Sequence, residues 1–264
     1  MLKILKYNKK NSQNALELFL DRRKLMQKNK ASTVSRILKS VKKNGDKAVL
    51  NYEKKFSKVK TKSSKIFFST KELNAISKKT DKKIKLAIDQ AYNRIRKFHS
   101  KQRFLSFKYK DKYKNELSYK YSAIEKIGVY VPGGTASYPS TVLMNCIPAQ
   151  VAGVKDIILT TPSLDSKINP AVVYAAKKCR VKKIYKTGGA HTIAALAYGT
   201  KKIKKVDKIV GPGNAYVAAA KKEVFGDVGI EGMTAGPSEI TIVCDKFSNA
   251  EWVASDLIGQ AEHD

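Results

Sequence analysis

The sequence predicts an α/β fold in which a helical N-terminal segment precedes a parallel, doubly wound sheet. Residues 1–120 carry their apolar residues mainly at helical spacing. After Ile124, short apolar strands alternate with turns rich in glycine and proline and with helices. This alternation indicates a parallel sheet, because parallel strands need a crossover connection that is usually a helix. No repeat, low-complexity run or flexible linker interrupts the pattern.

The helical part contains several amphipathic segments. Three short ones lie around Ala15–Leu25, Val34–Val41 and Lys47–Phe56, with Asn44-Gly45 as a turn between the last two. Residues 116–121 form a short extended stretch. The clearest helix places one apolar face at i, i+3, i+4 and i+7. That face consists of Ile84, Ala87, Ile88, Ala91, Ile95 and Phe98.

In the α/β part, each strand is expected to end in a turn that leads into a helix. The expected strands are Ile127–Val131, Asp156–Thr160, Lys183–Lys186, Val206–Val210 and Ile240–Cys244. The expected helices begin at Ser140 and cover Pro170–Cys179, Ile193–Tyr198 and Ala215–Phe225. Asn169 is predicted to cap the second of these helices, with Pro170 in its first turn.

Three turns are candidates for ligand binding: 132–134, 187–189 and 211–214. The carboxyl ends of parallel strands meet at one edge of a sheet, where ligands bind. Glycine there lets the backbone approach a phosphate, and the next helix offers free N–H groups. Ordinary turn chemistry explains any single one of these turns equally well. None matches G-x-G-x-x-G, so the pattern indicates a nucleotide or another anion bound in an unusual mode.

The formal net charge is +31, and it is concentrated in the N-terminal part. Residues 1–120 carry 36 Lys and Arg against 9 Asp and Glu, a net +27, whereas residues 121–264 carry 17 against 13, a net +4. Only seven of the 53 basic residues are arginine, and the lysines are spread over all the helical segments. Because nucleic-acid recognition favours clustered arginine, a solvated lysine-rich face is the favoured interpretation.

Other bulk features favour a soluble cytoplasmic protein. No apolar run approaches the roughly 20 residues of a membrane span, and the basic N-terminus lacks the apolar region of a secretory signal. The three cysteines, Cys146, Cys179 and Cys244, are odd in number and widely spaced. They indicate buried thiols in a reducing compartment rather than a disulfide framework.

Few residues carry recognisable chemistry. His191 follows a Gly-Gly-Ala turn, where a ligand contact and a simple helix start are both open. Ser238 is either a turn hydroxyl or a substrate contact. His263 and Gln260 lie three residues apart, which is a metal-ligand spacing on a helix. A zinc site needs three or four protein ligands, however, so these two residues alone favour a polar helix end.

Five stretches together resemble the histidinol dehydrogenase family. They occur in the family's order at family-like spacing, and the resemblance is strong from about Ile124 onward and weak in the basic helical part. The stretches are IGVYVPGGTASYPSTVLMNCIPAQVAGV (127–154), TGGAHTIAALAYGT (187–200), KVDKIVGPGNAYVAAAK (205–221), MTAGPSEI (233–240) and ASDLIGQAEHD (254–264).

The resemblance implies an enzyme that uses NAD and Zn²⁺ to oxidise L-histidinol to L-histidine through histidinal, consuming two NAD. It also implies two incomplete Rossmann-like domains and an intertwined homodimer. Transferred to this chain, the domains are an N-terminal helical segment (1–25), a first Rossmann-like domain (26–128 plus 238–264) and a second one (129–237).

The same resemblance assigns roles to individual residues. Tyr130, His191 and Asn214 would contact NAD, although the family usually has glutamine where this chain has His191. Ser238, Gln260 and His263 would contact the substrate, and Gln260 and His263 would also bind zinc.

The family's catalytic Glu–His pair has no counterpart here, so no catalytic residue is assigned. We therefore expect a truncated or split chain. The alternatives are an inactive fragment that needs a separate C-terminal piece, and a basic nucleic-acid-associated protein.

Overall fold

The computed structural model describes residues 12–57, 66–102, 104–133, 138–163, 167–231 and 240–261. The helices are α1 (Ser12–Ser57), α2 (Thr70–Lys78), α3 (Lys82–His99), α4 (Pro139–Ala152), α5 (Pro170–Lys178), α6 (Ala190–Tyr198), α7 (Ala215–Glu223) and α8 (Ala250–Ala261). The strands are β1 (Phe107–Lys110), β2 (Glu116–Tyr119), β3 (Lys126–Tyr130), β4 (Asp156–Thr161), β5 (Lys183–Lys186), β6 (Lys208–Val210) and β7 (Gly229–Ile230).

The centre of the molecule is a five-stranded sheet in the order β5-β4-β3-β6-β7. All four strand pairings are parallel, and β3 lies in the middle. From β3 the chain first builds one half of the sheet through β4 and β5, and then crosses to β6 and β7 on the other side. The predicted α/β class with a doubly wound parallel sheet is confirmed.

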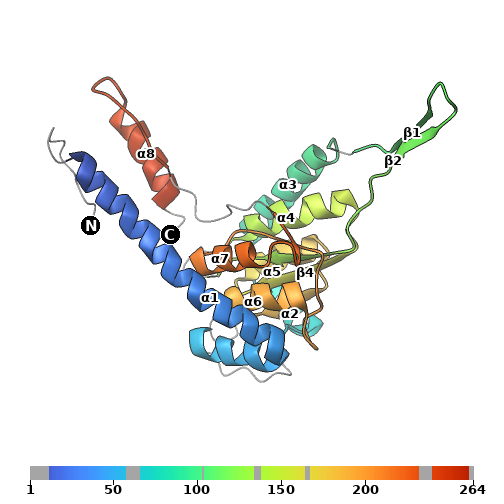
Figure 1. Cartoon of the computed structure of the whole chain (residues 1–264), viewed down its shortest axis with the longest axis horizontal. Helices are drawn as coiled ribbons and strands as arrows, with labels where there is room; N and C mark the ends of the chain where they lie inside the picture. Colours follow the sequence, from blue (N-terminus) through green and yellow to red (C-terminus); the bar gives the residue numbers. More distant parts are fainter. Residues whose placement is uncertain are drawn as a thin grey trace.

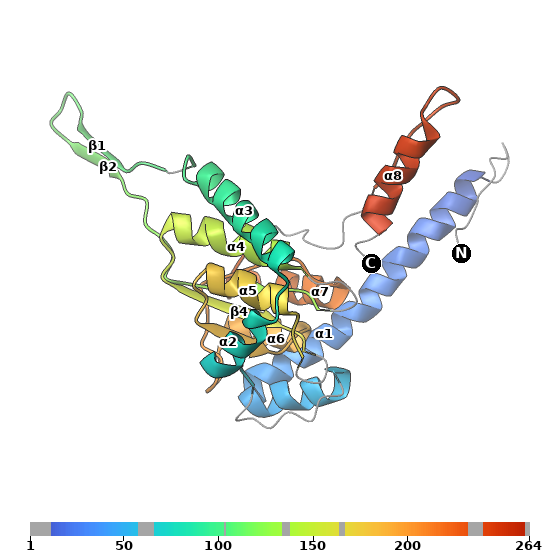
Figure 2. The ribbon, with the colours of Figure 1, turned by 180° about the vertical axis from the view of Figure 1, so that it is seen from behind.

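Helices cover both faces of the sheet (Figures 1 and 2). On one face α1, α6 and α7 pack together around buried residues such as Ile193, Leu196 and Val217. On the other face α2, α3, α4 and α5 enclose a second cluster that includes Ile147 and Val173. Each fully buried aliphatic side chain stabilises the fold by about 1.5–3 kcal/mol, so both layers hold the sheet in place.

Helix α1 differs from the separate segments that the sequence predicts. The three predicted segments belong to one element with a kink at Gly45, where φ is 52° and ψ is −131°. The turn predicted at Asn44-Gly45 is therefore this kink, since glycine is the residue that adopts positive φ without strain. Val34 and Leu38 before the kink and Val49 after it are all buried in the cluster that contains α6.

The β1–β2 hairpin and helix α8 lie away from the sheet layers, at opposite ends of the molecule in Figure 1. The antiparallel hairpin of β1 and β2 is exposed at every residue of both strands. Helix α8 exposes Trp252 and Ile258. The extended stretch predicted at 116–121 is confirmed for residues 116–119, which form β2. Among the described helices, none combines the length and the apolar character that crossing a bilayer requires.

The strand predicted at Ile240–Cys244 is wrong. These residues form no regular element, Val243 is 94% exposed, and the last strand of the sheet among the described residues is β7. A run of residues with high strand propensity becomes a strand only when a partner strand and a buried face are present. The cysteine prediction holds in part, because Cys146 and Cys179 are buried whereas Cys244 is exposed. The division into domains at 128/129 and 237/238 stays a prediction.

Candidate active site at the carboxyl edge of the sheet

The strand order fixes where a ligand would bind. The connection from β3 leads into α4 on one face of the sheet, and the connection from β6 leads into α7 on the other. Neighbouring parallel strands whose connections depart to opposite faces leave a crevice beyond their carboxyl ends. By this rule a ligand is expected beyond the carboxyl ends of β3 and β6, next to Tyr130, the last residue of β3, and the turn 211–214 that follows β6.

The glycines of these turns are explained by packing within the protein. A Cβ atom at Gly188 would overlap the ring of Pro162, and one at Gly211 would overlap the carbonyl oxygen of Tyr130. Gly211 also has a φ of +99°, which favours glycine on its own account. The turns themselves therefore account for these glycines, which do not by themselves indicate a ligand. A ligand site must be argued from the polar side chains around it.

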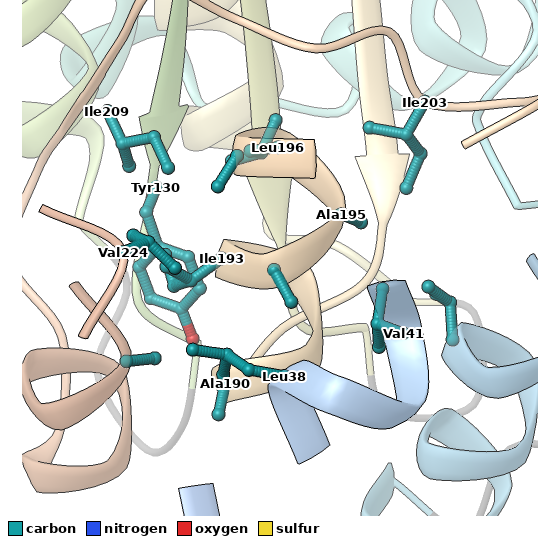
Figure 3. Packing of buried hydrophobic residues seen from close by; sticks show 14 of the residues in the cluster. Leu38, Val41, Tyr130, Ala190, Ile193, Ala195, Leu196, Ile203, Ile209 and Val224 are labelled. Carbon is teal, nitrogen blue, oxygen red and sulfur yellow. The ribbon is translucent and has the colours of Figure 1, made fainter. Parts of the chain in front are cut away.

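Tyr130 reaches from β3 to the start of α6. Its buried hydroxyl accepts a hydrogen bond of 3.0 Å from the backbone N–H of Gly189, and Figure 3 shows the hydroxyl pointing toward the region of Ala190. Burial raises the pKa of Tyr130 to about 12, and the charge of Glu53 adds to the rise while the Gly189 N–H opposes it. The phenol therefore stays protonated near neutral pH and can donate its own proton to a ligand.

His191 lies in the first turn of α6, and its side chain is 2% exposed. The ring nitrogen Nε2 lies 2.8 Å from Oε1 of Glu53. The rings of Tyr52 and Phe56 stack with the imidazole at centroid distances of 5.8 and 6.1 Å. The other ring nitrogen, Nδ1, is buried and has no hydrogen-bond partner among the described residues. It is the one nitrogen of the ring whose hydrogen-bonding capacity is unused among the described residues.

Glu53 comes from α1, and the sequence gives no hint of its place in the site. Its Oε1 accepts hydrogen bonds of 2.8 Å from both the Gly188 N–H and the His191 ring. Burial by itself would raise the pKa of Glu53, but the hydrogen bond and charge of His191, with further hydrogen bonds from Gly188 and Ser57, hold it below its usual value. Glu53 is therefore a buried carboxylate at the turn 187–189.

Asn214 performs a structural task of its own. Its side-chain Oδ1 caps α7 by accepting the N–H groups of Tyr216 and Val217, each at 3.1 Å. The side chain is exposed, and its amide nitrogen bonds to no other residue in the described part of the chain. Beneath the same turn, the buried amino group of Lys221 donates to the carbonyl oxygen of Gly211. Burial lowers the pKa of this lysine.

The other predicted site residues are not placed. Ser238 and His263 lie outside the described residues, and of Gln260 only the backbone in α8 is described. Within the described ranges, no three histidine, cysteine, aspartate or glutamate side chains come together as a metal site would require. The substrate and zinc roles of these three residues stay predictions.

Comparison with known proteins points to one family. The family model of histidinol dehydrogenase matches residues 20–264. A histidinol dehydrogenase of Pelagibacter ubique is 61% identical over the whole chain, which covers 61% of that protein. One of Mesorhizobium japonicum is 50% identical over 88% of the chain and 54% of its own length. The crystal structure of the Elizabethkingia anophelis enzyme matches with a TM-score of 0.79 and 41% identity, over 88% of this chain and 53% of that one.

Proposed function

Since the chain belongs to the histidinol dehydrogenase family, we propose that it forms the NAD-binding part of an enzyme that oxidises L-histidinol to L-histidine through histidinal. The chain spans between half and two thirds of the length of the relatives it matches. The complete reaction, a cytoplasmic homodimer and a separately supplied C-terminal piece are accordingly parts of the proposal.

The observation that carries the proposal is the position of Tyr130 and Asn214 at the carboxyl ends of the neighbouring strands β3 and β6. Each keeps a polar group that can donate a hydrogen bond, the Tyr130 hydroxyl and the Asn214 amide. His191 is proposed as a third contact through Nδ1, which is buried and would have to become accessible when NAD binds. A small number of placed hydrogen-bond donors is what orients a cofactor in a binding site. NAD, when bound, accepts a hydride in each of the two oxidations.

Zinc is also part of the proposal, and it rests only on the family resemblance and on two proposed ligands. The described residues contain no complete set of metal ligands, so no step of the reaction is derived through the metal. Gln260 and His263 are proposed as two of its ligands. Two ligands are fewer than the three that a catalytic zinc site takes from the protein, so further ligands must come from elsewhere in the assembly.

Calorimetric titration with NAD tests whether these residues at the carboxyl edge of the sheet bind the cofactor. We expect His191→Gln to keep or improve NAD affinity, because a glutamine amide can donate to Glu53 and still has a second polar atom to offer. A large loss of affinity would show that the imidazole has a role of its own. A chain that folds but takes up no NAD, with or without the substitution, would contradict the proposal.

A further inference from the structure

The turn 187–189 binds an anion that belongs to the protein itself, the carboxylate of Glu53. Oε1 of Glu53 accepts the N–H of Gly188 and the Nε2 of His191, both at 2.8 Å. The next N–H, that of Gly189, donates to the Tyr130 hydroxyl at 3.0 Å. Both backbone donors of the glycine pair are therefore used internally. In other α/β proteins the same kind of donors holds a phosphate.

The carboxylate is fixed in this position and sealed from solvent. The side chain of Glu53 is 4% exposed, and the aromatic rings of Tyr52 and Phe56 cover the imidazole that it contacts. On the inner side, the hydroxyl of Thr192 donates to the carbonyl oxygen of Gly188 at 2.8 Å. A phosphate could reach the Gly188 N–H only by displacing Glu53. If Glu53 stayed in place, two negative charges would share one donor group, which is strongly unfavourable in a buried site.

The topology agrees with this arrangement. Strand β5, which precedes the turn, is an edge strand of the sheet, whereas the carboxyl ends where a ligand is expected are those of β3 and β6, near its middle. Ligands of doubly wound folds bind there and not beyond an edge strand. Closing the turn 187–189 to a phosphate therefore leaves the carboxyl ends of β3 and β6 open, although the Tyr130 hydroxyl adjoins both places.

We infer that Glu53 is a specificity-determining residue that keeps phosphate groups out of the turn 187–189. It occupies the Gly188 N–H, which would otherwise be available to a phosphate, and it positions His191 at the start of α6. Where the ligand is NAD, the inference rests on the proposed function and directs the phosphates of the cofactor away from this turn. The exclusion of phosphate itself does not depend on NAD.

The test is a titration of the full 264-residue chain, ¹⁵N-labelled, with inorganic pyrophosphate, following the amide signals of Gly188 and Gly189. In the wild-type chain we expect these signals to stay unchanged. In Glu53→Ala the two amides should shift and saturate, with affinity at least about tenfold above the wild type, since a charge-assisted contact becomes available. Glu53→Gln keeps the size and one acceptor oxygen, and it should show a smaller gain. It also serves as the test variant if Glu53→Ala does not fold.

The matched control is Glu125→Ala, which removes the same charge from an exposed position. It separates site binding from general attraction of pyrophosphate to a chain of net charge +31. Wild-type Gly188 and Gly189 amides that shift as in Glu53→Ala would overturn the inference, as would Glu53 variants that bind no more pyrophosphate than Glu125→Ala. A parallel NAD titration keeps the proposals apart, because failure to bind NAD would count against the proposed function alone.

Discussion

At the scale of single residues, the candidate site is organised by a carboxylate that arrives from a distant part of the chain. Glu53 and His191 are 138 positions apart, yet their side chains share a hydrogen bond at 2.8 Å in a buried environment. Buried charges persist in proteins only when hydrogen bonds and opposite charges compensate their loss of hydration. The Gly188 N–H and the imidazole provide that compensation for Glu53.

This compensation makes stability depend on pH in a defined direction. The pKa of Glu53 is lowered from its usual 4.5, so its contribution to stability is complete above pH 4.5 and is lost as the pH falls through the lowered pKa. We expect Glu53→Gln to cost about 1.5–3 kcal/mol at neutral pH, the range for hydrogen bonds to charged groups. Below pH 4.5 the difference from the wild type should shrink. Urea unfolding at a series of pH values measures it.

Glu125→Gln is the matched control for this measurement, because it neutralises an exposed carboxylate. It should change the unfolding free energy little at any pH. A Glu53→Gln variant whose deficit stays constant down to strongly acidic pH would contradict the account of Glu53 as an ionised group in the folded chain.

Sequence reasoning finds only part of this residue network. Tyr130, His191 and Asn214 stand in recognisable stretches next to turns, so the motif resemblance singles them out. Glu53 follows no motif, and its flanking lysines suggest a solvated helix face. The signal that places it in the site is a contact between distant segments, which one sequence does not reveal.

At the scale of elements, Asn214 at the start of α7 has two tasks, since it caps the helix and is a proposed contact for NAD. Asn214 uses its oxygen to cap the helix and leaves its amide nitrogen for a ligand. Asn214→Asp keeps the capping oxygen but removes the donor, so we expect unchanged thermal stability and about tenfold weaker NAD binding. Asn214→Ala should in addition destabilise the chain by about 1 kcal/mol. Thermal unfolding and NAD titration of both variants distinguish the two tasks.

One outcome would contradict the proposed contact between Asn214 and NAD. If Asn214→Asp binds NAD as tightly as the wild type while Asn214→Ala loses stability, the residue is a helix cap and no more.

Most elements could be predicted from the sequence, and the exceptions have physical reasons. The sequence predicts the strands with the clearest apolar pattern, β3, β4 and β5, to within a residue at each end, because they are buried on both faces. Strand β7 is too short to leave a pattern, and the stretch 240–244 has the propensity of a strand without a partner. The turn that the sequence predicts at Asn44-Gly45 is the kink in α1, because a local glycine signal does not show that the helical segments on either side belong to one element.

At the scale of the whole molecule, the described surface has two apolar projections. The β1–β2 hairpin exposes Phe107, Tyr109 and Tyr119, and the region of α8 exposes Phe247 and Trp252. Exposed apolar groups of this size are typical of surfaces that contact another polypeptide. They support the proposal that activity needs more polypeptide than this chain, whether a second copy, a further piece or both.

The most direct test of the proposed function is a reconstitution assay. The chain is mixed with Zn²⁺, L-histidinol and NAD, with and without a polypeptide that comprises the part of the Pelagibacter ubique relative that the chain does not cover. His263→Ala in the same mixture tests the proposed zinc ligand through zinc retention as well as activity. We expect NADH only in the complete mixture, at two NADH per histidinol consumed, and loss of bound zinc in the variant. NADH from the chain alone, or no NADH from a folded and zinc-loaded mixture, would contradict the account.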